Sequence, residues 1–240
     1  MPRTHRIPIA AVCSAALLAS AAPATAGPLT GAAAPTGAAA PTGASAPISS
    51  VPTRSYRADV DGDGRRDTVT IGSVREGTLR VAVRTARGAR SSIDIDQGEF
   101  GPLTPPHPFH GAADVDGVRG QELFVFYGQG AHTPWFKVLT WRSGRLFATR
   151  EPQTRDTMWA PDAAYGYGTG YAVTGTGASR RLVITNATRS GARYRGTAVT
   201  YAWAASRWVK KGTRQVSFSE AGSGAVFGWH VRGITAWPEW

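Results

Sequence analysis

The chain has 240 residues, of which 42% are hydrophobic and 18% are charged, and this composition agrees with one compact domain. Without Arg3 and Arg6 of the amino-terminal segment, 25 basic residues stand against 16 acidic ones, and the resulting net charge of +9 favours anionic partners. The excess is scattered arginine whose few doublets are too dispersed for a nucleic-acid motif, so we expect no specific nucleic-acid binding. The alternative explanation of the positive net charge is that these arginines lie on the surface and have no binding role.

The chain opens with a predicted secretory signal peptide, residues 1–26. Two arginines precede an apolar stretch from Ile7 to Ala22, and small residues lead to a cleavage site before Gly27. The stretch is too short for a membrane span, and no later segment resembles an anchor, so we expect a secreted, extracellular protein without a transmembrane segment. The only cysteine, Cys13, lies in the signal peptide, so the mature domain is expected to hold together without disulfides.

A linker and then the folded domain follow. Residues 27–52 repeat Ala-Pro-Thr-Gly-Ala without a charged side chain, which predicts a flexible linker that forms no core. Aromatic and β-branched residues begin at Tyr56. We therefore expect one folded domain over residues 53–240.

A run of closely spaced carboxylates marks the start of this domain. Acidic side chains occupy loop positions 1, 3, 5 and 9, and a glycine occupies position 6: Asp59, Asp61, Asp63, Asp67 and Gly64. Four carboxylates this close repel one another unless a hard cation lies among them, and Ca²⁺ takes roughly 6–8 oxygen ligands. Arg65, at position 7, would add its backbone carbonyl. Position 12 is Thr70 in a β-branched run, so the loop leads into a strand and is no EF-hand. The alternative is an Asx-turn cluster before a hairpin, without a metal.

The acidic pattern returns in part 55 residues later. The matching residues are Asp114, Asp116 and Glu122. Val118 replaces the third aspartate and Arg119 replaces the glycine, so one ligand is lost, a cation is added, and the sequence predicts a weaker metal-type loop. A third copy, from Val173 to Gly177, has no carboxylate and is expected to be structural only.

The spacing of these copies predicts a repeat architecture. Each loop is followed by about three predicted strands, and no stretch shows convincing helical periodicity. The predicted units are roughly residues 56–112, 113–171 and 172–230. The fold class is therefore expected to be all-β.

The first loop and the apolar strand after it resemble the FG-GAP or VCBS-type repeats of secreted bacterial proteins and of the integrin α-subunit head. In that family each repeat is a four-stranded β-propeller blade with the calcium loop Asp-x-Asp-x-Asp-Gly-x-x-Asp, which residues 59–67 match in full. The resemblance covers residues 56–230 and implies a β-propeller-like domain with structural Ca²⁺. Propellers close with 4–8 blades, whereas this chain shows three units. We expect three antiparallel blades in an open or irregular stack; a fourth blade and completion by association are the alternatives.

Aromatic residues are the other candidates for recognition. The glycine-spaced stretch 159–171 is expected to be an exposed loop whose aromatic side chains contact a ligand, or else a connection between blades. The candidates are Trp159, Tyr165, Tyr167 and Tyr171. Three tryptophans in predicted strands are expected to pack in the core or between blades: Trp141, Trp203 and Trp208.

Motifs for catalysis are scarce. The chain has no nucleophile elbow and no phosphate loop, and the prolines beside His107 and His110 exclude a helix that would place both imidazoles on one face. The sequence predicts a secreted, calcium-stabilised, non-catalytic module that binds a glycan, a cell-surface polymer or a protein. An extracellular hydrolase on the same scaffold and a structural spacer in the envelope are the alternatives. Acidic residues that meet His107, His110 or His132 in a cleft would favour the hydrolase, whereas an aromatic or arginine-rich face would favour binding.

Overall fold

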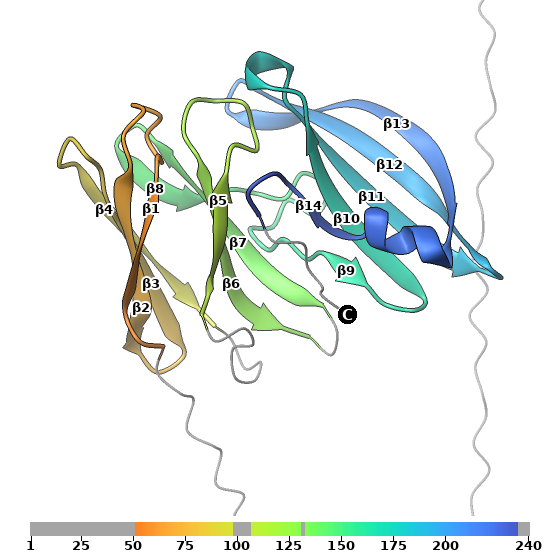
Figure 1. The fold of residues 1–240 in the computed structure, drawn as a ribbon, viewed down its shortest axis with the longest axis horizontal. Helices are drawn as coiled ribbons and strands as arrows, with labels where there is room; N and C mark the ends of the chain where they lie inside the picture. The colour runs from red at the N-terminus through yellow and green to blue at the C-terminus, as the bar shows by residue number, and fades with distance from the viewer. Residues whose placement is uncertain (1–50, 98–106, 131–132, 235–240) are drawn as a thin grey trace, which may run out of the picture. The chain divides into compact units, whose positions relative to one another are not determined.

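The computed structural model describes residues 51–97, 107–130 and 133–234 (Figure 1). Everything described here belongs to one compact unit of the chain, within residues 46–240. The predicted signal peptide and nearly all of the predicted linker lie outside the described residues. Within the described part, the chain forms fourteen strands in three separate sheets, so the predicted all-β fold class is confirmed.

The first sheet consists of β1 (Arg54–Ala58), β2 (Asp67–Arg75), β3 (Thr78–Arg84) and β4 (Arg90–Asp96), paired in that order. The second consists of β5 (Phe109–Ala113), β6 (Glu122–Gln129), β7 (Pro134–Arg142) and β8 (Arg145–Ala148), also paired in chain order. The third has the order β13-β12-β11-β10-β14, from β10 (Tyr167–Thr174), β11 (Arg181–Ser190), β12 (Arg193–Ala204), β13 (Arg207–Ser219) and β14 (Gly228–His230). β9 (Asp162–Ala163) also pairs with β10, and two short 3₁₀ helices, η1 (Gly177–Ser179) and η2 (Glu220–Ala225), complete the described elements. All pairs between these strands are antiparallel except the parallel pair of β10 and β14.

The second and third repeats begin one strand earlier than the sequence predicted, whereas the first begins with β1. The first loop lies between β1 and β2, the second between β5 and β6, and the third between β10 and β11. The predicted boundaries at 113 and 172 are therefore wrong: the first separates most of β5 from its sheet, and the second falls inside β10. Both strands contain glycine and small residues in place of the β-branched alternation that marks a strand in sequence.

The folded domain also includes residues assigned to the linker. Val51 is buried, its N–H donates to the Ser73 hydroxyl (2.9 Å), and its carbonyl accepts a hydrogen bond from the Ser73 N–H (3.0 Å). The predicted boundary at residue 53 is therefore wrong by two residues.

The middle sheet is buried on both faces. Because alternate residues of a strand point to opposite faces, Leu123 and Val125 of β6 join one core while Phe124 and Phe126 join another. The first core adds residues from the first sheet, chiefly Val69, Ile71, Leu79 and Val81. The second adds residues from the third sheet, chiefly Leu182, Ile184 and Val199. This double burial explains why β6 is an unbroken apolar run.

An aromatic cluster fills the second core. Trp229 of β14 lies 4.9 Å from Phe124, 5.5 Å from Phe136 and 4.8 Å from Tyr171, measured between ring centroids. Trp159 is 1% exposed and packs on Tyr171, which is 3% exposed. The prediction that these two residues lie in an exposed recognition loop is wrong: their large apolar rings are the contacts between the second and third sheets.

The stack of sheets is open. None of the three described sheets is closed, and the outer face of the first carries polar side chains such as Thr68, Thr70, Arg80 and Arg84, which suit water and not another blade. At the other end of the chain, β14 adds to the edge of β10, and Ile234 forms a bridge to Gly111 of β5. These observations agree with three propeller-like blades in an open arrangement.

Candidate metal centre

The first acidic loop is anchored at its base by Asp67. This side chain, in a residue that is 1% exposed, accepts hydrogen bonds from the Val60 N–H at Oδ2 (2.7 Å) and from the Ala86 N–H at Oδ1 (2.7 Å). The first bond closes the loop on itself, and the second ties it to the turn that follows β3. Asp67 is thus held in place as the first residue of β2, with lone pairs left on both oxygens.

Three carboxylates converge in this loop. Oxygen atoms of Asp59, Asp61 and Asp67 lie within 4.8 Å of one another, a grouping that could hold a metal ion. Asp59 Oδ2 accepts a hydrogen bond from the Gly64 N–H (2.9 Å), whereas Asp59 Oδ1 is buried and has no hydrogen-bond partner. Partial burial, together with the negative charges of Asp67, Asp63 and Asp59, raises the pKa of Asp61 above its usual value.

The remaining predicted ligands lie at the rim. Asp63 is outside the group of three; its Oδ2 lies 3.0 Å from Nε of Arg87, whose side chain is 72% exposed. The Arg65 N–H donates to Asp63 Oδ1 (2.9 Å), and the role of the Arg65 carbonyl stays a prediction. Gly64 has φ +85°, so position 6 has the left-handed backbone that the predicted sharp turn needs.

The second loop docks against the first. The Asp59 N–H donates to Gln121 Oε1 (3.0 Å), and the Gln121 N–H donates to the Asp59 carbonyl (2.8 Å). At Gly120 a Cβ would lie 2.4 Å from the Val60 carbonyl oxygen, so at this point the backbones of the two loops are in direct contact. The position of Asp59 therefore depends on a residue 62 positions away.

The second acidic cluster already contains cations of the protein itself. Oxygen atoms of Asp114, Asp116 and Glu122 also lie within 4.8 Å of one another. The Arg142 guanidinium donates through Nη2 to Asp116 Oδ2 (2.7 Å) and to Glu122 Oε1 (3.1 Å). Arg180, from the third loop, donates to Asp114 Oδ2 (2.7 Å).

The other oxygens of this cluster also have donors. The N–H groups of Gly117, Val118 and Val115 donate to Asp114 Oδ1, Asp116 Oδ1 and Glu122 Oε2, each at 2.8 Å. From the sequence, Arg119 was the cation expected near this loop. In the structure, Arg142 and Arg180 are the cations that bind its carboxylates. They were missed because neither lies near the loop in sequence.

Burial dominates the electrostatics of this second cluster. Burial and the charge of Asp116 raise the pKa of Glu122 to about 8, although the Val115 N–H, the Arg142 guanidinium and the Thr140 hydroxyl favour its charged form. Burial also raises the pKa of Asp116. A carboxyl that keeps its proton near neutrality reduces the charge available to an added metal ion.

The other predicted recognition residues are divided between surface and core. Tyr165 is 72% exposed and Tyr167 is 47% exposed, and the Arg189 guanidinium lies 4.0 Å from the centre of the Tyr165 ring. Trp159 and Tyr171 are buried, as described above.

The described histidines considered for a hydrolase pack against aromatic side chains. His107 is hydrogen-bonded to the Tyr56 hydroxyl, and the His110 ring lies 4.9 Å from the Phe136 ring. His132 lies outside the described residues. The described part of the chain therefore does not bring His107 into a cleft with acidic residues.

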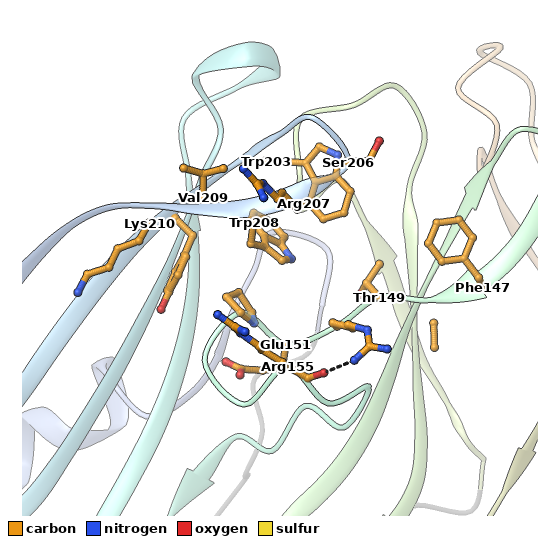
Figure 2. A pocket seen from close by; sticks show the side chains of 14 residues that line it. Phe147, Thr149, Glu151, Arg155, Trp203, Ser206, Arg207, Trp208, Val209 and Lys210 are labelled. Atoms are coloured by element: carbon orange, nitrogen blue, oxygen red, sulfur yellow. Dashed lines mark hydrogen bonds between the residues drawn. The ribbon is translucent and has the colours of Figure 1, made fainter.

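A cleft that the sequence did not indicate lies between the second and third sheets. We call it the hairpin cleft; its fourteen lining residues lie between 147 and 155 on one side and between 201 and 210 on the other, and its volume is about 870 Å³. Figure 2 shows Trp203 and Trp208 on the β12–β13 hairpin, Phe147 across from them, and Glu151 and Arg155 below the hairpin in this view. Trp141 packs between the first two sheets and Trp208 packs against the second core, as predicted; Trp208 and Trp203, both only half-buried, also line this cleft. In the sequence, the five-residue spacing of Trp203 and Trp208 could indicate that they lie on the two strands of one hairpin. Only the packing of the sheets shows that they face a cavity.

Comparisons with known proteins found no relative: no family model, no curated protein and no solved structure matches the chain. Within residues 51–97, 107–130 and 133–234, no helix is long and apolar enough to cross a membrane.

Proposed function

We propose that the first acidic loop binds Ca²⁺ and that the protein is a secreted, calcium-stabilised β-repeat module whose role is to bind an extracellular ligand. The observation that carries this proposal is the difference between the two acidic loops. In the second loop two guanidinium groups supply the positive charge, and every carboxylate oxygen has a donor. In the first, considering the described residues, the buried Asp59 Oδ1 has no partner, and the one ion pair is that of Asp63 with the exposed Arg87.

The oxygen donors of the first loop suit a hard cation. Asp59, Asp61 and Asp67 supply carboxylates without a nitrogen or sulfur ligand among them, which favours Ca²⁺ or Mg²⁺ over zinc. Ca²⁺ tolerates irregular geometry, whereas Mg²⁺ demands a near-ideal octahedron. The resemblance of residues 59–67 to the FG-GAP and VCBS-type loop supports the same ion, and the predicted signal peptide supports an extracellular setting, where calcium is abundant.

The hairpin cleft favours binding over hydrolysis. Its lining includes aromatic side chains and four basic residues, and Glu151 is the single carboxylate among its described lining residues. Glycoside and related hydrolysis generally needs a pair of acid–base groups that flank the scissile bond. The arrangement matches the aromatic and arginine-rich face expected of a binding module.

Thermal unfolding with and without calcium tests the metal site. For the chain without its signal peptide, Ca²⁺ at about one hundred times its Kd should stabilise the folded state by about 2.7 kcal/mol. For a domain of this size that corresponds to a rise in Tm of about 5–10 °C, which a chelator reverses.

Two variants and a second ion complete this experiment. Asp61→Asn should abolish the rise in Tm, whereas Asp94→Asn, which changes an exposed carboxylate on β4, should keep it. Mg²⁺ should stabilise less than Ca²⁺. A Tm that does not respond to millimolar Ca²⁺, or a response that survives Asp61→Asn, would contradict the proposal.

A further inference from the structure

The hairpin cleft combines three chemical features. The first is aromatic surface: Trp203 and Trp208 lie edge to face at 5.2 Å between ring centroids, and both line the cavity with Tyr201 and Phe147. Both indole rings are only half-buried, and Trp208 also packs against the second core, so the cleft presents aromatic surface that is available to a ligand.

The second feature is uncompensated positive charge. Arg150, Arg155, Arg207 and Lys210 line the cleft against the single carboxylate of Glu151. Within the described part of the chain, Arg155, Arg207 and Lys210 pair with no carboxylate. The basic surface continues along β13 through Lys211 and Arg214, which are exposed, and β13 contains no acidic residue. This surface complements an extended anion.

The third feature is a pair of polar atoms without partners. Glu151 is 1% exposed; its Oε2 accepts hydrogen bonds from the Gln153 and Thr154 N–H groups (2.7 and 2.6 Å), but its Oε1 has none. The indole N–H of Trp208 also lacks an acceptor. Leaving such groups unpaired costs about 1–3 kcal/mol each, and a ligand with hydroxyl groups would relieve that cost.

Backbone strain occurs at the same place. Arg155 has φ +62° and Ser206 has φ +60°, although neither is glycine, and both line the cleft. Left-handed backbone at non-glycine residues persists where the surrounding structure imposes it, and it is frequent at ligand sites.

We propose that the hairpin cleft binds an acidic saccharide, a chain of sugar rings bearing carboxylates. The apolar face of a ring would stack on Trp208 or Trp203, the carboxylates would meet Arg155, Arg207 and Lys210, and hydroxyl groups would bond to Glu151 and the Trp208 N–H. A phosphodiester chain satisfies the aromatic and basic residues but offers few donors for Glu151, so a nucleic acid fits the cleft less well. This inference rests on the proposed binding role and names the ligand class and the site.

The test is a calorimetric and tryptophan-fluorescence titration of the chain without its signal peptide, at fixed calcium concentration. The probes are a trimer of galacturonic acid, a neutral galactose trimer and a single-stranded DNA oligonucleotide. The acidic trimer should bind with an affinity that falls as salt is added, and at least about tenfold more tightly than the neutral trimer. Trp208→Ala should weaken binding about tenfold and Arg207→Ala several-fold.

Controls separate the cleft from other surfaces. Arg84→Ala removes an exposed charge from the first sheet, away from the cleft and from β13, and Tyr165→Ala removes an exposed ring elsewhere on the third sheet; both should bind as the unmodified protein does. If Trp208→Ala does not fold, Trp208→Phe and Arg207→Gln provide the comparison. Absence of binding by the acidic trimer, equal binding by the neutral trimer, tighter binding of DNA, or affinity unchanged by both cleft variants would overturn the proposal.

The calcium response is measured separately, as a Tm shift without saccharide. A failed titration therefore leaves the metal site intact, and a failed calcium response leaves the saccharide result interpretable.

Discussion

Arg142→Met is expected to destabilise the domain by about 3 kcal/mol at pH 8. The guanidinium donates to both Asp116 and Glu122, whose side chains are each 2% exposed, while its own side chain is 21% exposed. Removal of one partner from a buried ion pair costs about 3–5 kcal/mol, because the other charge is left uncompensated. We take the lower end, since part of the Arg142 side chain is in contact with water.

The pH dependence of this loss distinguishes electrostatics from packing. Methionine keeps most of the apolar stem, so the lost interaction is chiefly that of the charge. Without the guanidinium, the two carboxyls hold their protons more tightly in the folded state than in the unfolded state. Protonation at low pH then removes the repulsion, so the destabilisation should be smaller at pH 5.5 than at pH 8.

The assay is urea unfolding followed by tryptophan fluorescence at both pH values. Arg145→Met, in an exposed residue that pairs with Arg142 across the same hairpin, is the matched control and should change the free energy of unfolding by less than about 0.5 kcal/mol. The double variant Arg142→Met with Glu122→Gln should be more stable than the sum of the single changes predicts. A loss below about 1 kcal/mol at pH 8, or an equal loss at both pH values, would refute the assignment of Arg142 as the cation of this cluster.

Three further predictions concern the core, the pH profile and the contact between loops. Trp159→Ala should cost about 3–5 kcal/mol in urea unfolding, whereas Tyr165→Ala should cost less than about 0.5 kcal/mol; similar losses would contradict the burial described here. Because the folded-state pKa of Glu122 is raised from 4.5 to about 8, its contribution to stability is present at low pH and declines as the pH rises through that window, by up to about 1.4 kcal/mol per pH unit. Glu122→Gln should flatten this slope in urea midpoints measured from pH 5 to pH 8, and an unchanged slope would assign it to another group. Gly120→Ala would place a Cβ 2.4 Å from a carbonyl oxygen of the first loop at φ +113°, and should lower the free energy of unfolding by more than about 2 kcal/mol. The control is Gly144→Ala, at φ +77° with open space around it, which should lower it by about 1 kcal/mol. Equal urea midpoints for the two variants would show that the loops do not touch as described.

Several features of this protein follow from the sequence alone, because they depend on residues close together in the chain. The aspartates of the first loop lie within nine residues, and a turn brings neighbouring side chains together whatever the rest of the fold does. The all-β class and the number of repeats follow from the alternation within strands and from the return of the loop pattern. Both features arise from residues that are close in the chain, so the sequence could predict three repeats, and the structure shows three sheets.

The tertiary structure decided what each local pattern becomes. Arg142 and Arg180 reach the second acidic cluster from 20 and 66 residues away, so no inspection of that loop reveals that its charge is already compensated. Trp159 and Tyr171 were indistinguishable in sequence from the exposed Tyr165, because burial depends on which sheet packs against them. The hairpin cleft likewise exists only where two sheets meet. Local sequence limits which conformations a segment adopts, whereas charge compensation, burial and cavities arise from contacts between distant segments, and only the folded chain brings those segments together.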